Sequence, residues 1–443
     1  MKYNPSLHKL SNGITVIFDP MDMETTSVKI RFNTGSRDEK PEQYGITHFC
    51  EHMFCCGTQR FPNRETIRRF LDQHGLNTNA STGNPFVQFY GDCLPEKLDI
   101  LIDFLADRLQ NSSFNPDSIE IERGAILDEL NRNLDQDSIK YKDLMDRELF
   151  GNKNFVFCSK NLGSSKTIKS FSRNQLLMFI KSRLSSKNCT IIISGKIENQ
   201  EQILQKLEQH FQFLKPFDVP ENTDVEYTPK QAHLTQPGHN NTTMSIFFKN
   251  IYPDGKEYKF QVFCVQRLRN FIRDKLQQCL RHNNGLVYSV SNTAYGNHKF
   301  SIGGIQTQTA PHNVKKCVAL IAQTCADIYF NNTMTQEDLD LLNTRIKLND
   351  AKFLDSRSDR ESEILNHYHC NNELYDFESE RKLKESITLQ DIVKYTRGIF
   401  DEKNMSILTT GADHNCDLMQ VWRDNFKPNI SNVLLKNMND RDL

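Results

Sequence analysis

The chain contains an internal repeat that restricts it to folds built from two similar domains. Residues 170–195 align without gaps on residues 386–411. In each copy a Ser or Thr suited to cap a helix precedes an amphipathic segment, and a Lys-Asn pair follows at 187–188 or 403–404. An apolar strand then closes on a glycine in both copies. Helix, boundary and strand repeat in one register, so two copies of one domain fold are the simplest interpretation.

The fold class and the domain limits follow from signals along the chain. A polar segment rich in proline separates the two copies, as a linker does. We therefore expect a first domain at residues 1–218, a linker at 219–238 and a second domain at 239–443. Strand and helix signals are mixed without regular βαβ units, and Asn12-Gly13 marks a hairpin turn. These patterns predict an α+β fold in which each domain has an antiparallel-rich sheet packed with helices.

Periodicity and turn residues place the individual elements of the first domain. We expect strands at 14–18 and 27–32, an extended segment at 78–90, and helices at 44–56, 63–74, 95–111 and 116–135. Asn63 is the expected N-cap of the second of these helices.

The composition excludes several classes of partner. Lys and Arg number 55 against 56 Asp and Glu, so no net charge favours nucleic acid or an anionic membrane surface. The N-terminus has no apolar core of a signal peptide, and no apolar run is long enough to span a bilayer. The 12 cysteines are scattered and form no CxxC pair. This pattern is typical of reduced thiols, and we expect a cytoplasmic protein.

The string His48-Phe49-Cys50-Glu51-His52 indicates a metal hydrolase site. On a helix, His48 and His52 lie one turn apart on the same face, where two imidazoles can share one metal ion. Glu51 lies beside them, positioned to act as a base toward water. The order is the inverse of HExxH, the arrangement found in inverzincins.

A second segment, in the helix expected at 116–135, offers further carboxylates. Glu122 and Glu129 are seven residues apart and share one helical face. An ordinary solvated acidic face is the alternative interpretation. The apolar residues Ile126, Leu127 and Leu130 in the same segment argue against it.

The chain resembles the pitrilysin/insulysin family of zinc peptidases, which includes mitochondrial processing peptidase. The resemblance is carried by Thr34-Gly35-Ser36-Arg37-Asp38-Glu39, by Gly45-Ile46-Thr47 with the HxxEH string and Met53, and by Gly57-Thr58. In the family the third ligand is a Glu after seventy-six intervening residues, which corresponds to Glu129 here. The resemblance implies one Zn²⁺ per chain, held by His48, His52 and Glu129. It also implies Glu51 as general base and Glu122 as the residue that holds a ligand imidazole.

The resemblance extends to a segment that contacts substrate. Asn79-Ala80-Ser81-Thr82 matches a cleft-lining strand, which in the family pairs with the substrate backbone. Gly83 and Pro85 depart from the family pattern immediately afterwards. Pro85 lacks an N–H group, which suits an edge strand but leaves the details of substrate binding open.

In the second copy the resemblance implies that the active site is completed by another chain. Arg281 and Tyr288 match an Arg…Tyr pair that in relatives stabilises the scissile carbonyl oxygen from the opposite half of a clamshell. A chain of this length would be half of that clamshell. We therefore expect a homodimer in which Arg281 and Tyr288 act in trans, enclosing a chamber for short or unfolded peptides.

Two other functions remain open at this point. The chain could be a non-catalytic scaffold, as are the core subunits of respiratory complexes that descend from the same family. It could also be the active subunit of a heterodimer with a zinc-less partner. Intact ligand positions argue against the first alternative, and the presence of Arg281 and Tyr288 argues against the second.

Overall fold

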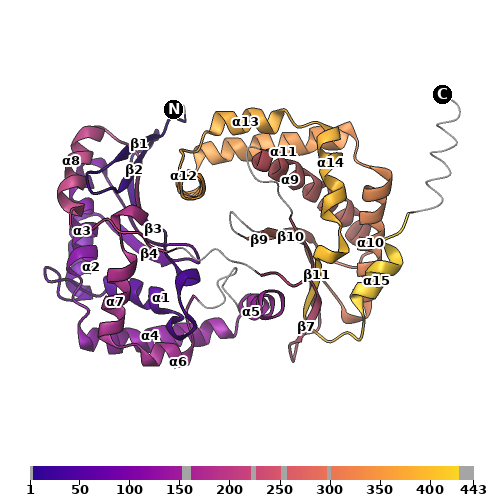
Figure 1. The fold of residues 1–443 in the computed structure, drawn as a ribbon, viewed down its shortest axis with the longest axis horizontal. Helices are drawn as coiled ribbons and strands as arrows, with labels where there is room; N and C mark the ends of the chain where they lie inside the picture. The colour runs from indigo at the N-terminus through magenta and orange to yellow at the C-terminus, as the bar shows by residue number, and fades with distance from the viewer. Residues whose placement is uncertain (1–2, 152–160, 221–225, 251–256, 297–300, 429–443) are drawn as a thin grey trace. The chain divides into compact units, whose positions relative to one another are not determined.

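The computed structural model describes residues 3–151, 161–220, 226–250, 257–296 and 301–428. These residues form two compact units, each built around one β-sheet (Figure 1). The first unit takes most of the N-terminal half of the chain together with residues 352–376. The remainder, with the segment that starts at Asp143, forms the second unit.

The first unit has a six-stranded sheet in the order β1-β2-β6-β3-β5-β4. Its strands are β1 (Ser6–Lys9), β2 (Thr15–Pro20), β3 (Thr26–Phe32), β4 (Asn77–Thr82), β5 (Val87–Cys93) and β6 (Cys189–Gly195). Its helices are α1 (Ile46–Phe54), α2 (Arg64–His74), α3 (Leu98–Asn111), α4 (Pro116–Leu134), α6 (Ser165–Ser170), α7 (Arg173–Arg183), α8 (Gln200–Phe211) and α12 (Arg357–Asn371). All neighbouring strands are antiparallel except β2 and β6, which are parallel.

Alternation along β3 divides its side chains between two faces. Val28, Ile30 and Phe32 belong to the hydrophobic core of the first unit, with α1, α3, α7 and α8. Lys29 and Arg31 point to the other face and are also buried. A charged residue is stable in a buried position only when it is paired, so this face requires a polar cover.

Helix α12 supplies that cover, although it comes from the second half of the chain. Arg360 Nε donates to Asp19 Oδ2 at 2.9 Å, and Lys29 Nζ lies 2.6 Å from Glu361 Oε2. Arg31 Nη1 donates to the side-chain oxygen of Asn366 at 2.7 Å. These paired charges explain why residues 352–376 belong to the first unit, which the expected division at 219–238 did not include.

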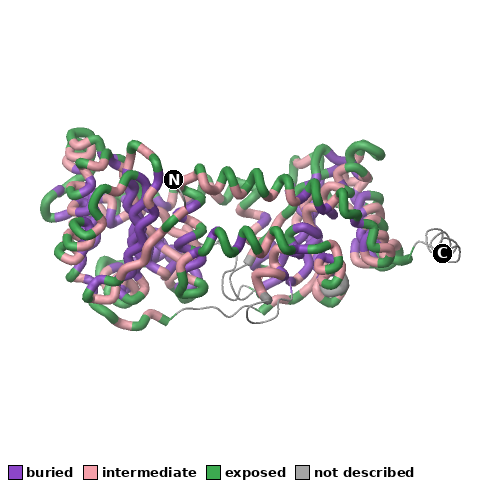
Figure 2. The backbone as a smooth tube through the Cα atoms, turned by 90° about the horizontal axis from the view of Figure 1, so that it is seen from above, coloured by how far each residue is buried: buried purple, intermediate pink, exposed green. Residues whose placement is uncertain are grey.

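The second unit repeats the sheet with one strand fewer, in the order β7-β11-β8-β10-β9. Its strands are β7 (Gln231–Thr235), β8 (Thr242–Lys249), β9 (Val290–Gly296), β10 (Ser301–Thr309) and β11 (Met405–Gly411). Helices α9 (Glu257–Leu276), α10 (Val314–Asn331), α13 (Phe377–Glu385), α14 (Leu389–Ile399) and α15 (Leu418–Asn425) belong to it, whereas α5 (Asp137–Phe150) and α11 (Gln336–Asp355) contribute residues to both units. In each unit the buried residues follow the strands and the inner helices (Figure 2).

The internal repeat predicted from the sequence is confirmed. Helix α7 with strand β6 and helix α14 with strand β11 are equivalent, and Ser172 and Thr388 cap the two helices through hydrogen bonds to the third helical residue. Both strands end on a glycine with positive φ, 99° at Gly195 and 109° at Gly411. A side chain there would meet the carbonyl oxygen of the neighbouring strand, so only glycine fits.

The predicted elements of the first domain are also confirmed within a few residues at their ends. The expected helix at 63–74 is α2 with Asn63 as its N-cap, and the extended segment at 78–90 is the hairpin of β4 and β5. Residues 231–235, expected in the linker, instead form β7, which pairs parallel with β11. Among the described residues, no helix is both long and apolar enough to cross a membrane.

Candidate metal centre

The start of helix α1 depends on the backbone conformation of Gly45 and on the buried side chain of Glu39. Gly45 has φ 89°, and a side chain there would collide with the backbone of Gly163 at 2.7 Å. The carboxylate of Glu39 accepts hydrogen bonds from the N–H groups of Gly45 and Thr47, both at 2.8 Å. Glu39 therefore satisfies backbone donors that a helix leaves unpaired at its start, and it anchors α1.

The predicted ligand set converges at one point. His48 and His52 lie on one face of α1, with ring centroids 4.6 Å apart. An oxygen of Glu129, on α4, lies 3.8 Å from His48 Nε2 and 3.6 Å from His52 Nε2. One potential ligand atom from each residue lies within 4.8 Å of the other two, and no other such group of three occurs among the described residues.

Glu122 orients one of the two imidazoles. Its Oε2 lies 2.9 Å from His52 Nδ1, so this nitrogen donates its proton to Glu122, which leaves Nε2 as the ring nitrogen that can bind a metal ion once its own proton is lost. The nitrogen His48 Nδ1 is buried and has no hydrogen-bond partner in the described part of the chain. Two imidazole nitrogens and a carboxylate oxygen, with a carboxylate behind one of them, fit the ligand chemistry of Zn²⁺.

The pKa values of His48 and His52 are shifted in opposite directions by their surroundings. Burial, followed by the charge of His52, lowers the pKa of His48 to about 4. Burial also opposes charge on His52, but the hydrogen bonds to Glu122 and Glu129 outweigh it and raise the pKa to about 9. His48 is therefore neutral at pH 7, whereas a metal ion must displace a proton from His52.

Glu51 lies beside the ligands and is held from a different element. The hydroxyl of Thr82, at the end of β4, donates to Glu51 Oε2 at 2.9 Å. Burial raises the pKa of Glu51 above its ordinary value, against the opposing effect of this hydrogen bond. A raised carboxyl pKa suits a group that must accept and later return a proton near neutral pH.

The predicted substrate segment lies on an edge strand. Asn79, Ala80, Ser81 and Thr82 are in β4, which pairs with β5 on one side and ends the sheet on the other. Such an edge presents backbone N–H and C=O groups that can pair with an added extended chain.

Arg281 and Tyr288 are brought together in the second unit. A short π-helical turn (Gln277–Asn283) carries Arg281, and Gly285, with φ 62°, reverses the chain after it. The guanidinium carbon of Arg281 then lies 4.7 Å from the ring centroid of Tyr288, which is 81% exposed. Both polar groups are therefore available at the surface of this unit.

Comparisons with known proteins identify the family of this chain. The family model "Insulinase (Peptidase family M16)" matches residues 17–154, and the model "Peptidase M16 inactive domain" matches residues 170–345. The chain belongs to the peptidase M16 family. An uncharacterized zinc protease of Rickettsia felis is 26% identical over 93% of this chain and 98% of its own length. The mitochondrial-processing peptidase subunit beta of Dictyostelium discoideum is 30% identical over 47% of this chain and 44% of its own.

The fold is shared with solved structures of low sequence identity. A protease from Helicobacter pylori covers 92% of this chain, and 99% of that chain is matched, with a TM-score of 0.76 at 18% identity. Several relatives, among them that of Rickettsia felis, are named zinc proteases, so zinc peptidase chemistry is typical of the family. The family model named for an inactive domain matches residues 170–345, which include most of the second unit's sequence up to that point. The HxxEH string does not occur in these residues.

Three contacts at the M16 site were not predicted from the sequence. Glu39 was part of the quoted motif but had no assigned role, and Thr82 was assigned to substrate rather than to Glu51. Arg64, whose Nη2 lies 2.6 Å from Glu122 Oε1, was not considered. One signal was available for Arg64, because a cation in the first turn of a helix is unfavourable unless an anion lies nearby.

Proposed function

We propose that the chain is a zinc-dependent endopeptidase that hydrolyses short or unfolded peptides. The observation that carries this proposal is the convergence of His48, His52 and Glu129 on one point, with Glu51 on the same helix as the two histidines. Membership of the M16 family supports the same chemistry.

Each residue has a distinct part in the proposed reaction. His48, His52 and Glu129 would hold Zn²⁺, which when bound supplies a Lewis acid that makes water acidic and polarises the peptide carbonyl. The carboxylate of Glu51 takes a proton from the attacking water and delivers it to the leaving amine. Thr82 keeps that carboxylate directed toward the site through its hydroxyl.

The substrate would bind as an additional strand on β4. Its backbone would pair with residues 79–82, which places a peptide bond next to the last residue of the strand, Thr82, and therefore next to Glu51. Only a chain that can become extended can add to an edge in this way. This requirement favours short or unfolded peptides over folded proteins.

The carbonyl oxygen would be stabilised by a second copy of the chain. The cationic Arg281 and the phenol of Tyr288 are the type of donors that stabilise an oxyanion. We propose a homodimer that encloses a chamber, with this pair acting on the zinc site of the partner.

The first experiment tests the base and the metal together. Glu51→Gln should keep zinc and lower turnover of a quenched fluorescent peptide by about 10²–10⁴-fold, because the amide cannot accept the proton. Glu42→Gln, an exposed substitution of the same type, should leave turnover unchanged. Chelation should abolish wild-type hydrolysis and added zinc should restore it. Wild-type turnover in Glu51→Gln would contradict the assignment of Glu51 as the base, and a wild type without zinc-dependent hydrolysis would favour a non-catalytic scaffold.

The second experiment tests completion of the site in trans. Glu51→Gln and Arg281→Ala should each be inactive alone, and their mixture should recover roughly a quarter of wild-type activity after subunit exchange, from mixed dimers with one intact site. An active monomer would exclude action in trans. Recovery only after addition of a different protein would indicate a heterodimer.

A further inference from the structure

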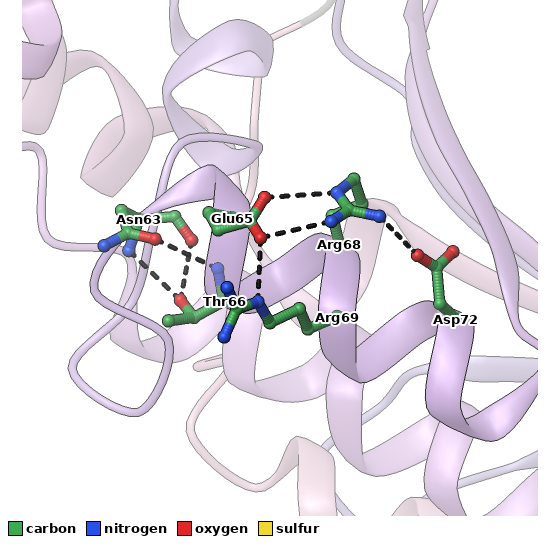
Figure 3. A network of polar contacts seen from close by, with 6 residues as sticks. All are labelled: Asn63, Glu65, Thr66, Arg68, Arg69 and Asp72. Atoms are coloured by element: carbon green, nitrogen blue, oxygen red, sulfur yellow. Dashed lines mark hydrogen bonds and ion pairs between the residues drawn. The ribbon is translucent and has the colours of Figure 1, made fainter.

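Helix α2 carries an arginine at an electrostatically unfavourable position. Arg64 lies in its first turn, next to the N-cap Asn63, where the helix macrodipole presents partial positive charge. The rest of the helix pairs its charges internally, as Figure 3 shows: Glu65 binds Arg68 and Arg69, and Arg68 also binds Asp72. Among the described residues, Arg64 is the one arginine of α2 that forms an ion pair with a residue outside the helix.

That residue is the carboxylate behind the metal site. Glu122 is 2% exposed, and its two oxygens have different partners. Oε1 lies 2.6 Å from Arg64 Nη2, and Oε2 lies 2.9 Å from His52 Nδ1. Because a buried carboxylate oxygen without a charged partner is costly, Arg64 supplies a cation to the oxygen that His52 leaves free, and the Cys56 thiol also contacts this carboxylate.

We propose that Arg64 is a positioning residue of the metal centre, which acts on the metal through Glu122 and His52. The inference rests on the proposed zinc site. With one oxygen held by Arg64, the carboxylate cannot turn away from His52. The imidazole then keeps its Nδ1 proton toward Glu122 and its Nε2 on the side of Glu129, where a metal ion would displace the second proton.

The contact between Arg64 and Glu122 differs from an ordinary surface ion pair in its burial. The Arg64 side chain is 61% exposed, but that of its partner is only 3% exposed, so the pair joins a solvent-facing cation to a buried anion. The pair of Arg69 and Glu65 on the same helix has both side chains more than half exposed, at 75% and 52%. Loss of that second pair should have little effect, because exposed ion pairs contribute little.

The test measures zinc affinity, with no peptide present. Zinc binding to wild type, Arg64→Met, Arg64→Lys and Arg69→Met would be compared by competition with a chromophoric chelator. We expect Arg64→Met to weaken zinc binding about tenfold, the lower end of the range for residues that support a ligand. Arg64→Lys should bind with intermediate affinity, and Arg69→Met should match wild type. Melting followed by circular dichroism should show that all four proteins are folded.

A double-mutant cycle tests whether Arg64 acts through Glu122. Glu122→Gln should weaken binding by about 10–100-fold, and Arg64→Met should add nothing in that background. Wild-type affinity in Arg64→Met, or additive losses in the double variant, would overturn the inference. Failure of the proposed function would look different: His52→Ala would then bind zinc as wild type does.

Discussion

Helices α4 and α11 follow equivalent parts of the two units, and their buried faces differ in chemistry. At the start of α4 the backbone N–H of Ile119 donates to the carbonyl oxygen of Asn115. At the start of α11 the N–H of Leu339 donates to the carbonyl oxygen of Thr335. Aligning these residues places Glu122 on Leu342 and Glu129 on Asn349. Glu122 and Leu342 are buried alike, with 2% and 3% exposure.

The difference shows what the first unit needs in order to carry a metal site. Glu122 can be buried because His52 and Arg64 both bind it. In the described part of the second unit, α9, which lies in the chain between the equivalents of β3 and β4, contains no histidine, and its buried Arg267 binds Asn343 of α11. Leucine at 342 joins the hydrophobic core instead. One fold therefore supports a copy with a buried acid and a copy with an apolar residue at this position, according to whether the acid finds partners.

The largest effect should follow when Glu129, the third ligand on α4, is replaced by asparagine, the residue at the equivalent position of α11. Glu129→Asn should lower zinc affinity by at least about 100-fold and abolish peptide hydrolysis, because a neutral amide replaces a charged ligand. Asp128→Asn makes the same chemical change at an exposed neighbouring position and should bind zinc normally. Chelator competition measures both. Normal zinc binding by Glu129→Asn would remove Glu129 from the ligand set.

The reverse exchange should damage the fold rather than the site. Leu342→Glu places a carboxylate in an apolar core without a partner and should destabilise the second unit by about 3–5 kcal/mol. Trp422 is the only tryptophan and is buried in that core, so its fluorescence reports this unit alone.

The matched variant in the first unit is Glu122→Leu. It should leave the unfolding midpoint seen by Trp422 unchanged and should weaken zinc binding instead. An equal loss of stability in the two variants would contradict the comparison.

The two units should lose similar amounts of stability when their equivalent glycines, Gly195 and Gly411, are replaced. Gly195→Ala and Gly411→Ala each place a Cβ 2.2–2.3 Å from a backbone oxygen at positive φ. Each should destabilise its own unit by about 1–3 kcal/mol or more. Trp422 fluorescence follows the second variant, and circular dichroism follows the first. Gly124→Ala, in open space on α4, should instead stabilise by about 0.5–1 kcal/mol. A large effect at only one of the paired glycines would break their equivalence.

The last expected effect is a pH dependence that originates in the first unit, with a slope that is small over any single pH unit. Burial raises the pKa of Glu39 to about 8, despite the hydrogen bonds that it accepts at the start of α1. An unfolded Glu loses its proton near pH 4.3, so between these values the folded state binds more protons than the unfolded state. Stability should therefore fall as pH rises from about 5 to 8, by at most about 1.4 kcal/mol per pH unit.

Glu39→Gln cannot titrate and should flatten this dependence. Urea unfolding at several pH values, followed by circular dichroism for the whole chain and by Trp422 for the second unit, measures it. The same slope before and after the substitution would show that Glu39 is not the titrating group.

Much of the fold was readable from local patterns. The repeat of Ser172 and Thr388 caps, the strands that follow and the closing glycines all depend on residues near one another in sequence, and the structure confirms them. Strand β7 was missed because prolines on both sides of a short polar segment resemble a linker. Its strand conformation depends on β11, which lies more than 150 residues later.

The sequence by itself determined the ligand types and their spacing on each helix. His48 and His52 share a face because a helix places residues four apart one above the other, and Glu122 and Glu129 do so for the same reason. The M16 family models match this chain over residues 17–154 and 170–345, which include these motifs.

Only the tertiary structure decided which side chains meet across elements. Packing of α1 against α4 brings Glu129 to the histidines, β4 delivers Thr82 to Glu51, and α2 delivers Arg64 to Glu122. Helix α12 pairs with the charged face of the first sheet in the same way. Such contacts join residues tens to hundreds of positions apart. Their distances are set by how whole elements pack, and local periodicity contains no information about them.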